Sequence, residues 1–200
     1  RVKLAVIVEG EGDVAAFPVL LRRVATALGC HDLEVLMPAR VSRALIAREA
    51  ELRRYVELMA RKVESEDAIM VAIDADDDCP AQLGPRLSGW ARAQRPDRRI
   101  VAIVIPREFE AWFLAGAVSL RGKRGLPLDL EPPERAAEQI RDAKGWLARQ
   151  MPRRYHETVD QAPLAACFDL QAARSCPSFE RFLQRVAGLL GCEVPALLFG

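Results

Sequence analysis

Acidic side chains follow two separate apolar segments of the sequence, with a spacing that suits a divalent cation. Glu9 and Asp13 follow the apolar run KLAVIV in the stretch VEGEGD, and Asp74 and Asp76 follow AIMVAI in the stretch IDADDD. Carboxylates that are brought together repel one another and retain protons unless a cation lies between them. Mg²⁺ prefers oxygen ligands of this kind, so the four acids predict a Mg²⁺ site if their segments meet.

The elements that must position these acids alternate between strands and helices. Apolar runs predict strands that are buried on both faces, at 3–8, 68–73 and 99–105, with a shorter strand at 33–37. Helical periodicity covers residues 13–28, 42–63, 81–94 and 108–117. This alternation predicts an α/β fold with a parallel sheet flanked by helices. Both acidic groups would then lie at the carboxyl edge of the sheet, where ligands bind in such folds.

The second half of the sequence has a different pattern. Residues 118–135 are rich in proline and glycine and read as a loop, whereas residues 136–200 are mostly helical, most clearly in SCPSFERFLQRVAGLLG. We therefore predict an α/β core at 1–117, and a loop with a helical C-terminal extension at 118–200 that packs on this core.

Composition excludes several classes of protein. A length of 200 residues with 50% hydrophobic content fits one compact domain, and a net charge of +1 provides no global field for nucleic acid. Five scattered cysteines without a CxxC pair indicate a reducing compartment and argue against zinc. We see neither a signal peptide nor an apolar run of about 20 residues, so we expect a cytoplasmic protein without a membrane partner.

Each acidic motif also has a simpler interpretation. Glu9 alone reads as a solvated loop acid, and Asp13 reads as the start of a helix. An EF-hand beginning at IDADDD needs glycine and glutamate where Cys79 and Pro85 stand. A dinucleotide fingerprint after the first strand needs a third glycine where Ala15 stands. The joint arrangement of the two motifs is therefore the stronger indication.

The combination of VEGEGD and IDADDD resembles the TOPRIM fold of topoisomerases, primases and OLD-family nucleases, in which a glutamate follows the first strand and D-x-D follows the third. The stretch PREFEAWFL is similar to a segment of OLD-like TOPRIM domains. Over most of its length the chain resembles the small bacterial family DUF4276, in VEGEGDVAAFPVLLRR, EFEAWFLA and YHETVDQAPLAACFDLQAARSCPSF. It departs from that family at Asp13, where glutamate is frequent, and at Cys176, where serine is expected.

The resemblance implies a TOPRIM-type nuclease that hydrolyses phosphodiesters of DNA or RNA with bound Mg²⁺ or Mn²⁺. Two such metals about 3.5–4 Å apart activate a water and stabilise the leaving oxygen. The implied metal ligands are Glu9, Asp13, Asp74, Asp76 and, as a reserve, Asp78. The implied catalytic residues are Glu9, Asp74, Asp76, Arg107 and Glu110. In this set Glu110 completes a second metal position and Arg107 neutralises charge on the phosphate, although a solvated helix start explains Arg107 nearly as well.

Other residues have a less certain relation to this site. Arg121, Lys123 and Arg124 form a basic loop that can contact phosphates of nucleic acid, or that is simply solvated. Trp112 can stack on a base, but core packing is the favoured interpretation. The segment around His156, which contains Arg153, Arg154, Tyr155, Asp160 and Gln161, either lines the site or, as we favour, ties the helical extension to the sheet.

Two alternative functions remain open. OLD-like TOPRIM domains are often paired with an ATPase, and this chain has no GxxxxGK[ST] loop of its own. In the first alternative, the chain is a non-catalytic or partner-activated subunit of an ATPase–TOPRIM complex, as in a bacterial defence module directed against phage. The second alternative is an α/β protein that binds a nucleotide or a small phosphate through a bridging metal. The oligomeric state does not follow from the sequence.

Overall fold

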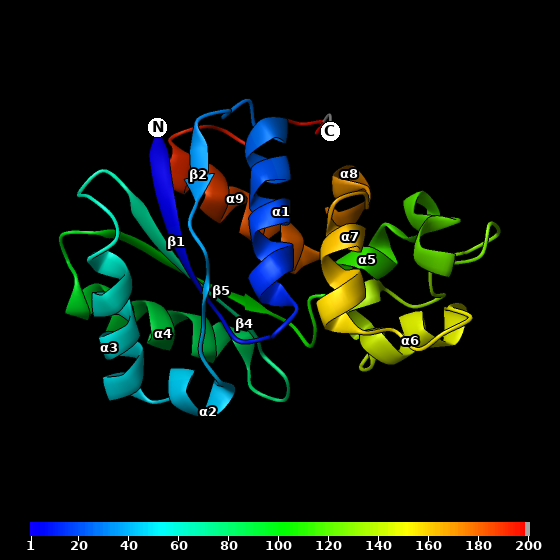
Figure 1. The fold of residues 1–200 in the computed structure, drawn as a ribbon, viewed down its shortest axis with the longest axis horizontal. Coiled ribbons are helices and arrows are strands. Elements are labelled where there is room, and N and C mark those ends of the chain that lie inside the picture. Colours follow the sequence, from blue (N-terminus) through cyan, green and yellow to red (C-terminus); the bar gives the residue numbers. More distant parts are fainter. Residues whose placement is uncertain (199–200) are drawn as a thin grey trace.

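The computed structural model describes residues 1–198 and is an α/β fold, as the sequence predicts (Figure 1). Within these residues a five-stranded sheet runs in the order β2-β1-β4-β5, with β3 also paired to β1. Every pairing is parallel. The strands are β1 (Val2–Val8), β2 (Leu33–Val35), β3 (Ala39–Arg40), β4 (Ala68–Asp74) and β5 (Arg99–Ile105).

The register of the sheet brings the two acidic segments to one edge. β1 and β4 are neighbours, and Val8 at the end of β1 pairs with Ala72 of β4. Asp74, two residues further along β4, pairs with Ile105 at the end of β5. Because parallel strands all end at the same edge, the segments after β1, β4 and β5 emerge side by side.

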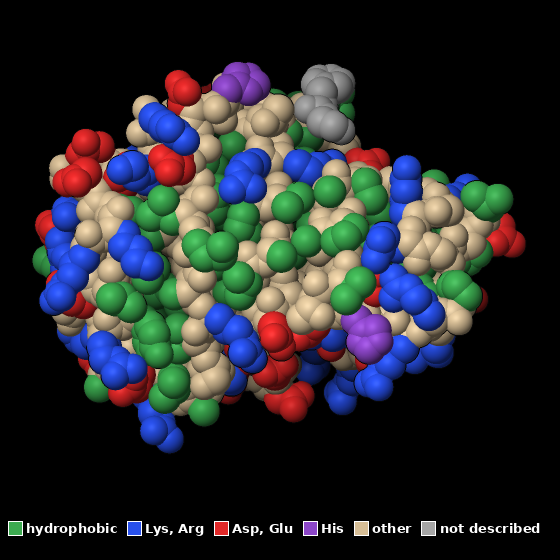
Figure 2. Space-filling view, in the orientation of Figure 1, with side chains coloured by type: hydrophobic (Ala, Val, Ile, Leu, Met, Phe, Trp, Pro, Cys, Tyr) green, Lys and Arg blue, Asp and Glu red, His purple; other side chains and the backbone are tan. Residues whose placement is uncertain are grey.

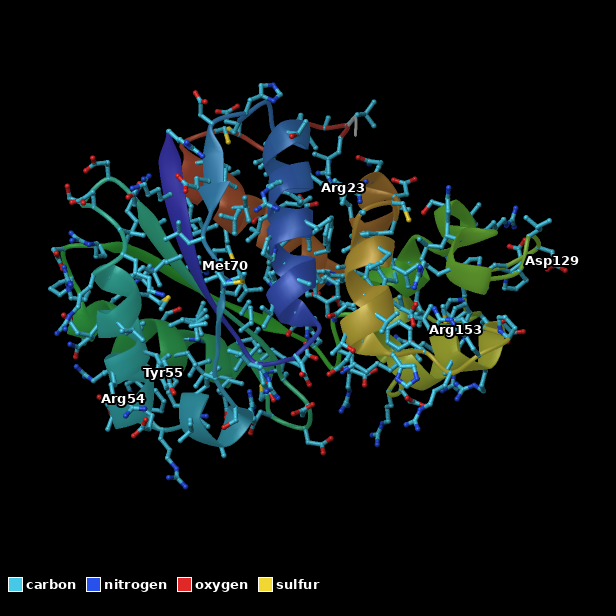
Figure 3. All side chains as sticks on the ribbon, in the orientation of Figure 1. Arg23, Arg54, Tyr55, Met70, Asp129 and Arg153 are labelled. Carbon is cyan, nitrogen blue, oxygen red and sulfur yellow. The ribbon has the colours of Figure 1, made fainter. Side chains whose placement is uncertain are left out.

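Helices cover both faces of the sheet, which explains why its central strands are apolar throughout. Alternate side chains of β1 enter two separate hydrophobic clusters. One cluster includes residues of α1 (Asp13–Ala27) and α9 (Pro177–Leu190), and the other includes residues of α3 (Glu49–Ala60) and α4 (Pro80–Gln94). Met70 of β4 belongs to the first cluster and lies in the middle of the sheet (Figure 3).

Two of the predicted helices differ from the observed ones. The helix expected at 42–63 is divided into α2 (Arg43–Ile46) and α3, because Arg48 adopts an extended backbone with φ −103° and ψ 123°. The helix expected at 108–117 is the short α5 (Ala111–Ala115), followed by the 3₁₀ turn η1 (Ala117–Leu120). The expected strand at 33–37 is observed as the shorter β2, and the two-residue β3 beyond it is too short to produce a sequence pattern.

The C-terminal extension is mostly helical, as predicted. Its remaining elements are η2 (Lys123–Gly125), η3 (Ala137–Gln139), α6 (Ala143–Gln150), η4 (Glu157–Gln161), α7 (Ala162–Ala165) and α8 (Leu170–Ala173). Arg23 of α1 joins the extension to the core by donating hydrogen bonds to the carbonyls of Ala165 and Phe168, each at 2.9 Å (Figure 3). The division at residue 117 stays a prediction, and positions 199 and 200 of the predicted extension lie outside the described residues.

An aromatic core lies directly beneath the carboxyl edge of the sheet. Trp112 and Phe113 are fully buried, and Trp112 packs against Phe179 and Phe182 of α9 with ring centroids 5.1 and 5.2 Å away. The Trp112 indole also donates a 2.8 Å hydrogen bond to the Ser178 hydroxyl. Trp112 therefore serves core packing, and its buried ring is not available to stack on a base. Among residues 1–198, no helix combines the length and apolar character needed to cross a membrane.

Candidate carboxylate site

Four acids from three segments meet at the carboxyl edge of the sheet, and we call Glu9, Asp13, Asp74 and Glu110 the carboxylate cluster. Burial raises the pKa of Asp74 well above its usual value, and the charges of Asp13, Glu110 and Glu9 raise it further. Burial likewise raises the pKa of Glu9, with additional contributions from Asp76 and Asp13. The predicted meeting of the segments after β1 and β4 is thus present, although its use as a metal site stays a prediction.

Glu110 enters this cluster from the segment after β5 and is completely buried. Its Oε1 accepts hydrogen bonds from the Tyr155 hydroxyl at 2.8 Å and from the Gln161 amide at 3.2 Å. Burial raises the pKa of Glu110 to about 7, even though Lys144 and Tyr155 act in the opposite direction. A carboxyl group that titrates near neutral pH is suited to giving or accepting a proton.

Asp13 is held by its own loop and by the C-terminal extension. Its carboxylate accepts hydrogen bonds from the Gly10 amide at 3.0 Å and from the side chain of Gln161 at 3.1 Å. Gln161 therefore joins Asp13 to Glu110. This contact requires Gly12, because a Cβ there would lie 2.7 Å from the carbonyl oxygen of Glu157 and still closer to Oε1 of Gln161.

Lys144 is a cation whose charge lowers the pKa of all four acids of the cluster, and the sequence did not predict it. Burial disfavours its charged form, but Glu110, Glu157 and Asp74 outweigh this effect and raise the pKa of Lys144. Its ammonium group lies 2.9 Å from a carboxylate oxygen of Glu157 in η4. The only available signal in the sequence is that Lys144 is one of four lysines in an arginine-rich chain.

The segments after β4 and after β5 each contain a residue with an unusual backbone conformation. Asp76 has φ 50° and Arg107 has φ 69°, a left-handed conformation that side chains other than glycine rarely adopt. The Arg107 guanidinium donates hydrogen bonds to the Asp76 carbonyl at 3.1 Å and to the Asp77 carboxylate at 3.2 Å. Arg107 thus braces the loop that presents the exposed Asp76 beside Glu9. Such strained residues occur most often at functional sites.

Arg43 of α2 braces the same loop from its other side, and it also was not singled out by the sequence. It donates a 2.9 Å hydrogen bond to the Asp74 carbonyl and forms an ion pair with Asp78. After burial, its charge is the largest influence on the pKa of Glu9, which it lowers. Asp78 is therefore engaged by Arg43 in this structure, and its role as a metal ligand stays a prediction.

The side chains as placed do not enclose a cation. Among residues 1–198, no group of three or more Asp, Glu, His or Cys side chains is arranged to hold a metal ion. Oε2 of Glu9 and Oε2 of Glu110 are nevertheless buried without a hydrogen-bond partner. Buried carboxylate oxygens normally find a donor or a cation, so the chemistry of the site fits Mg²⁺ or Mn²⁺ once the side chains turn toward a shared ion.

The predicted nucleic-acid contacts are partly occupied by internal pairs. Arg121 forms an ion pair with Glu131, and Arg124 lies 3.1 Å from the buried carboxylate of Asp160. Lys123 is exposed at the surface. Binding of nucleic acid by this loop stays a prediction.

Asp160 ties the segment around His156 to the rest of the extension. Besides Arg124, it accepts hydrogen bonds from the Arg153 guanidinium and the His156 amide, the latter at 3.0 Å. Burial alone would raise the pKa of Asp160, but the hydrogen bonds from Arg153, His156 and Arg124 lower it to about 2. This segment therefore both fixes the fold, through Asp160, and reaches the carboxylate cluster, through Gln161.

A hollow of about 360 Å³ opens beside the carboxylate cluster. Its polar lining includes Lys144, Tyr155, His156 and the exposed Arg154, together with the acids Asp142 and Glu157. Figure 2 shows acidic side chains at the lower middle of the molecule, with Lys and Arg side chains to their right around α6, and Figure 3 places Arg153 in the same basic area. The hollow therefore combines basic and acidic side chains next to the carboxylate cluster.

Comparison with known proteins is consistent with the sequence motifs. The family model described as "Domain of unknown function (DUF4276)" matches residues 8–187, a span that includes all four acids of the carboxylate cluster and the tail residues that contact them. No curated protein and no solved structure gives a significant match. The chain belongs to the DUF4276 family.

Proposed function

We propose that this protein is a metal-dependent phosphodiesterase that acts on nucleic acid through a TOPRIM-like carboxylate site. The observation that supports this most is the meeting of Glu9 and Asp74, from the ends of two adjacent parallel strands, with the buried Glu110. A glutamate after the first strand and D-x-D after a neighbouring strand also correspond to the TOPRIM pattern.

In this proposal Glu9, Asp13, Asp74 and Asp76 hold Mg²⁺ or Mn²⁺, with Glu110 at a second position and Asp78 in reserve. When bound, the cation lowers the pKa of a water and stabilises the leaving oxygen. The unpartnered oxygens of Glu9 and Glu110 support this assignment, because a cation would satisfy both.

The chain's own residues supply the remaining functions. Lys144 lines the hollow and neutralises charge on the phosphate, together with Arg107 in the segment after β5. Tyr155 and Gln161 fix the orientation of Glu110 by hydrogen bonds to its Oε1, which leaves its Oε2 free for the second metal position. Arg154, which lines the hollow, and the exposed Lys123 supply further positive charge for contacts with the phosphate backbone.

A nuclease assay with a matched pair of variants tests this proposal. Plasmid, single-stranded DNA and RNA are each incubated with the protein and Mg²⁺ or Mn²⁺. We expect Glu9→Gln and Asp74→Asn to reduce cleavage by about 100-fold or more, because each removes charge needed to bind the cation. Glu11→Gln is the control, since Glu11 is exposed in the same loop. Equal cleavage by Glu9→Gln and Glu11→Gln would contradict the proposal.

A partner-activated form of the same activity is the second candidate. Gln161 is bonded to both Asp13 and Glu110, and Lys144 is paired with Glu157, so groups of the extension occupy the site. A partner that shifts this extension would release them. If an ATPase is encoded next to this gene, we expect cleavage only when both proteins and ATP are present. Full cleavage by the isolated chain, unchanged by that ATPase, would eliminate this candidate.

A further inference from the structure

A groove of about 760 Å³ lies along β5, between α4 and α9. β5 is the last strand in the sheet order, so one side of its backbone has no neighbouring strand. Ala102, Ile103 and Val104 form the floor of the groove, and helix residues form its two walls. None of the four acids of the carboxylate cluster lines it.

The backbone at the floor of the groove is oriented for pairing with another strand. The Ile105 carbonyl accepts a 2.8 Å hydrogen bond from the Ala75 amide beyond the end of β4. In a parallel strand, the N–H and C=O groups of one residue point to the same side, and those of the next residue point to the other side. Ile105 and Ile103 therefore face β4, whereas Ala102 and Val104 direct their backbone groups outward into the groove.

Among residues 1–198, a side-chain hydrogen bond covers the outward backbone of β5 at one end of this edge. The outward carbonyl of Ile100 accepts a 3.1 Å hydrogen bond from the Arg92 side chain, which covers it. Further along, Gly84 on the wall leaves room beside the Val104 side chain, since an added Cβ would lie at an ordinary 3.7 Å from Val104 Cγ2. An edge strand normally has its backbone groups covered or interrupted, so the open section at Ala102–Val104 is available to an extended chain.

The charge around the groove indicates what kind of chain it accepts. Arg92 on one wall, and Arg181 and Arg185 on the other, are exposed. Within the part of the chain that the structure describes, none of these three arginines forms a salt bridge with an acidic side chain. A second hollow shares Arg92 and Arg185 and continues toward Arg98 and Arg99.

We infer that this groove binds an extended acidic segment of a partner protein, which adds to β5 as a further strand. The outward peptide groups of Ala102 and Val104 are two residues apart, which is the repeat at which an added strand forms hydrogen bonds. Alternate side chains of the added strand then reach the walls of the groove. Glutamate or aspartate at those positions meets Arg181 and Arg185. Nucleic acid would find the arginines but would not use the backbone groups of Ala102 and Val104. The inference does not depend on the chemistry of the carboxylate cluster.

Fluorescence anisotropy with defined peptides tests the inference. The probes are labelled eight-residue peptides with valine or threonine at alternate positions and either glutamate, lysine or glutamine between them, together with a single-stranded oligonucleotide. We expect the glutamate peptide to bind most tightly. Arg181→Gln/Arg185→Gln should weaken its binding roughly tenfold. Arg22→Gln/Arg48→Gln, which changes two exposed arginines away from the groove, should leave it unchanged.

A backbone variant separates strand addition from simple charge attraction. Val104→Pro removes an outward N–H without removing a bond to β4, and we expect it to abolish binding of the glutamate peptide. Hydrogen exchange on the unmodified protein should show protection of the Ala102 and Val104 amides when this peptide binds. The inference is overturned if the glutamate peptide does not bind at 1 mM, binds no better than the lysine peptide, or binds without protecting these amides. Arginine-dependent binding of the oligonucleotide alone would identify the groove as a nucleic-acid site instead.

Discussion

At the scale of single residues, the site depends on a balance between buried acids and one lysine. Burial raises the pKa of all four acids of the carboxylate cluster, and the charge of Lys144 lowers the pKa of each of them. The sequence predicted Glu9, Asp13, Asp74 and Asp76 because each follows a recognisable strand. It did not predict Lys144 or Arg43, because nothing in their local sequence shows which side chains they approach in space.

Removing the charge of Lys144 should therefore destabilise the protein. We expect Lys144→Met to reduce the free energy of unfolding by about 1–2 kcal/mol, because the remaining acids lose a compensating charge that solvent partly screens. Urea denaturation measures this change, and Lys62→Met is the control at an exposed lysine. Addition of Mg²⁺ should restore part of the loss in Lys144→Met. An unfolding free energy equal to that of the Lys62→Met control would contradict the assigned role of Lys144.

At the scale of elements, the start of α1 packs closely against the short helix η4, and only a residue without a side chain at Gly12 allows this contact. The sequence predicted the β1–α1 segment and its glycines, since the strand and helix patterns on either side are clear. It did not show that Gly12 is required by the distant Gln161 and Glu157, because 148 positions separate Asp13 from Gln161. The divided helix at 42–63 and the two-residue β3 were missed for a similar reason, since the surrounding structure determines them.

Substitution of Gly12 tests this fit. Gly12→Ala should reduce the free energy of unfolding by about 1–3 kcal/mol, because the added methyl group displaces Gln161 and η4. The loss of the Gln161 contact should also lower nuclease activity. Gly188→Ala is the matched control, since an added Cβ at that exposed helical glycine meets nothing within 4 Å. Thermal unfolding compares the two variants, and equal stability of both would show that η4 does not press against Gly12.

The hydrogen bonds and ion pairs of Asp160 make the free energy of unfolding depend on pH. The pKa of this carboxyl is about 2 in the folded protein and 3.8 ordinarily, so the folded state favours the charged form. Its contribution to stability is present above about pH 4 and is lost as the pH falls toward 2, amounting to roughly 2 kcal/mol. Asp160→Asn should therefore be less stable than the unchanged protein at pH 7, with the difference shrinking below pH 4. A difference that is constant from pH 7 to pH 3, measured by urea denaturation, would refute this assignment.

At the scale of the whole molecule, one continuous aromatic and aliphatic core joins the sheet to the C-terminal extension. The α/β class and the parallel sheet followed from the sequence because long strands buried on both faces have a distinct apolar pattern. The way in which the extension closes the site did not follow, because Tyr155 and Gln161 reach the acids only through long-range packing. The molecule thus has a candidate active site at the carboxyl ends of β1 and β4, and a strand without a neighbour on one side at β5.

The most direct test of the central claim is a crystal of the protein soaked in Mn²⁺, with anomalous diffraction used to locate the metal. Our account predicts a strong anomalous peak between the carboxylates of Glu9 and Asp74, and its loss in crystals of Glu9→Gln. Glu11→Gln should retain the peak. An absence of any peak at this edge, or a peak found only at other surface acids, would contradict the account.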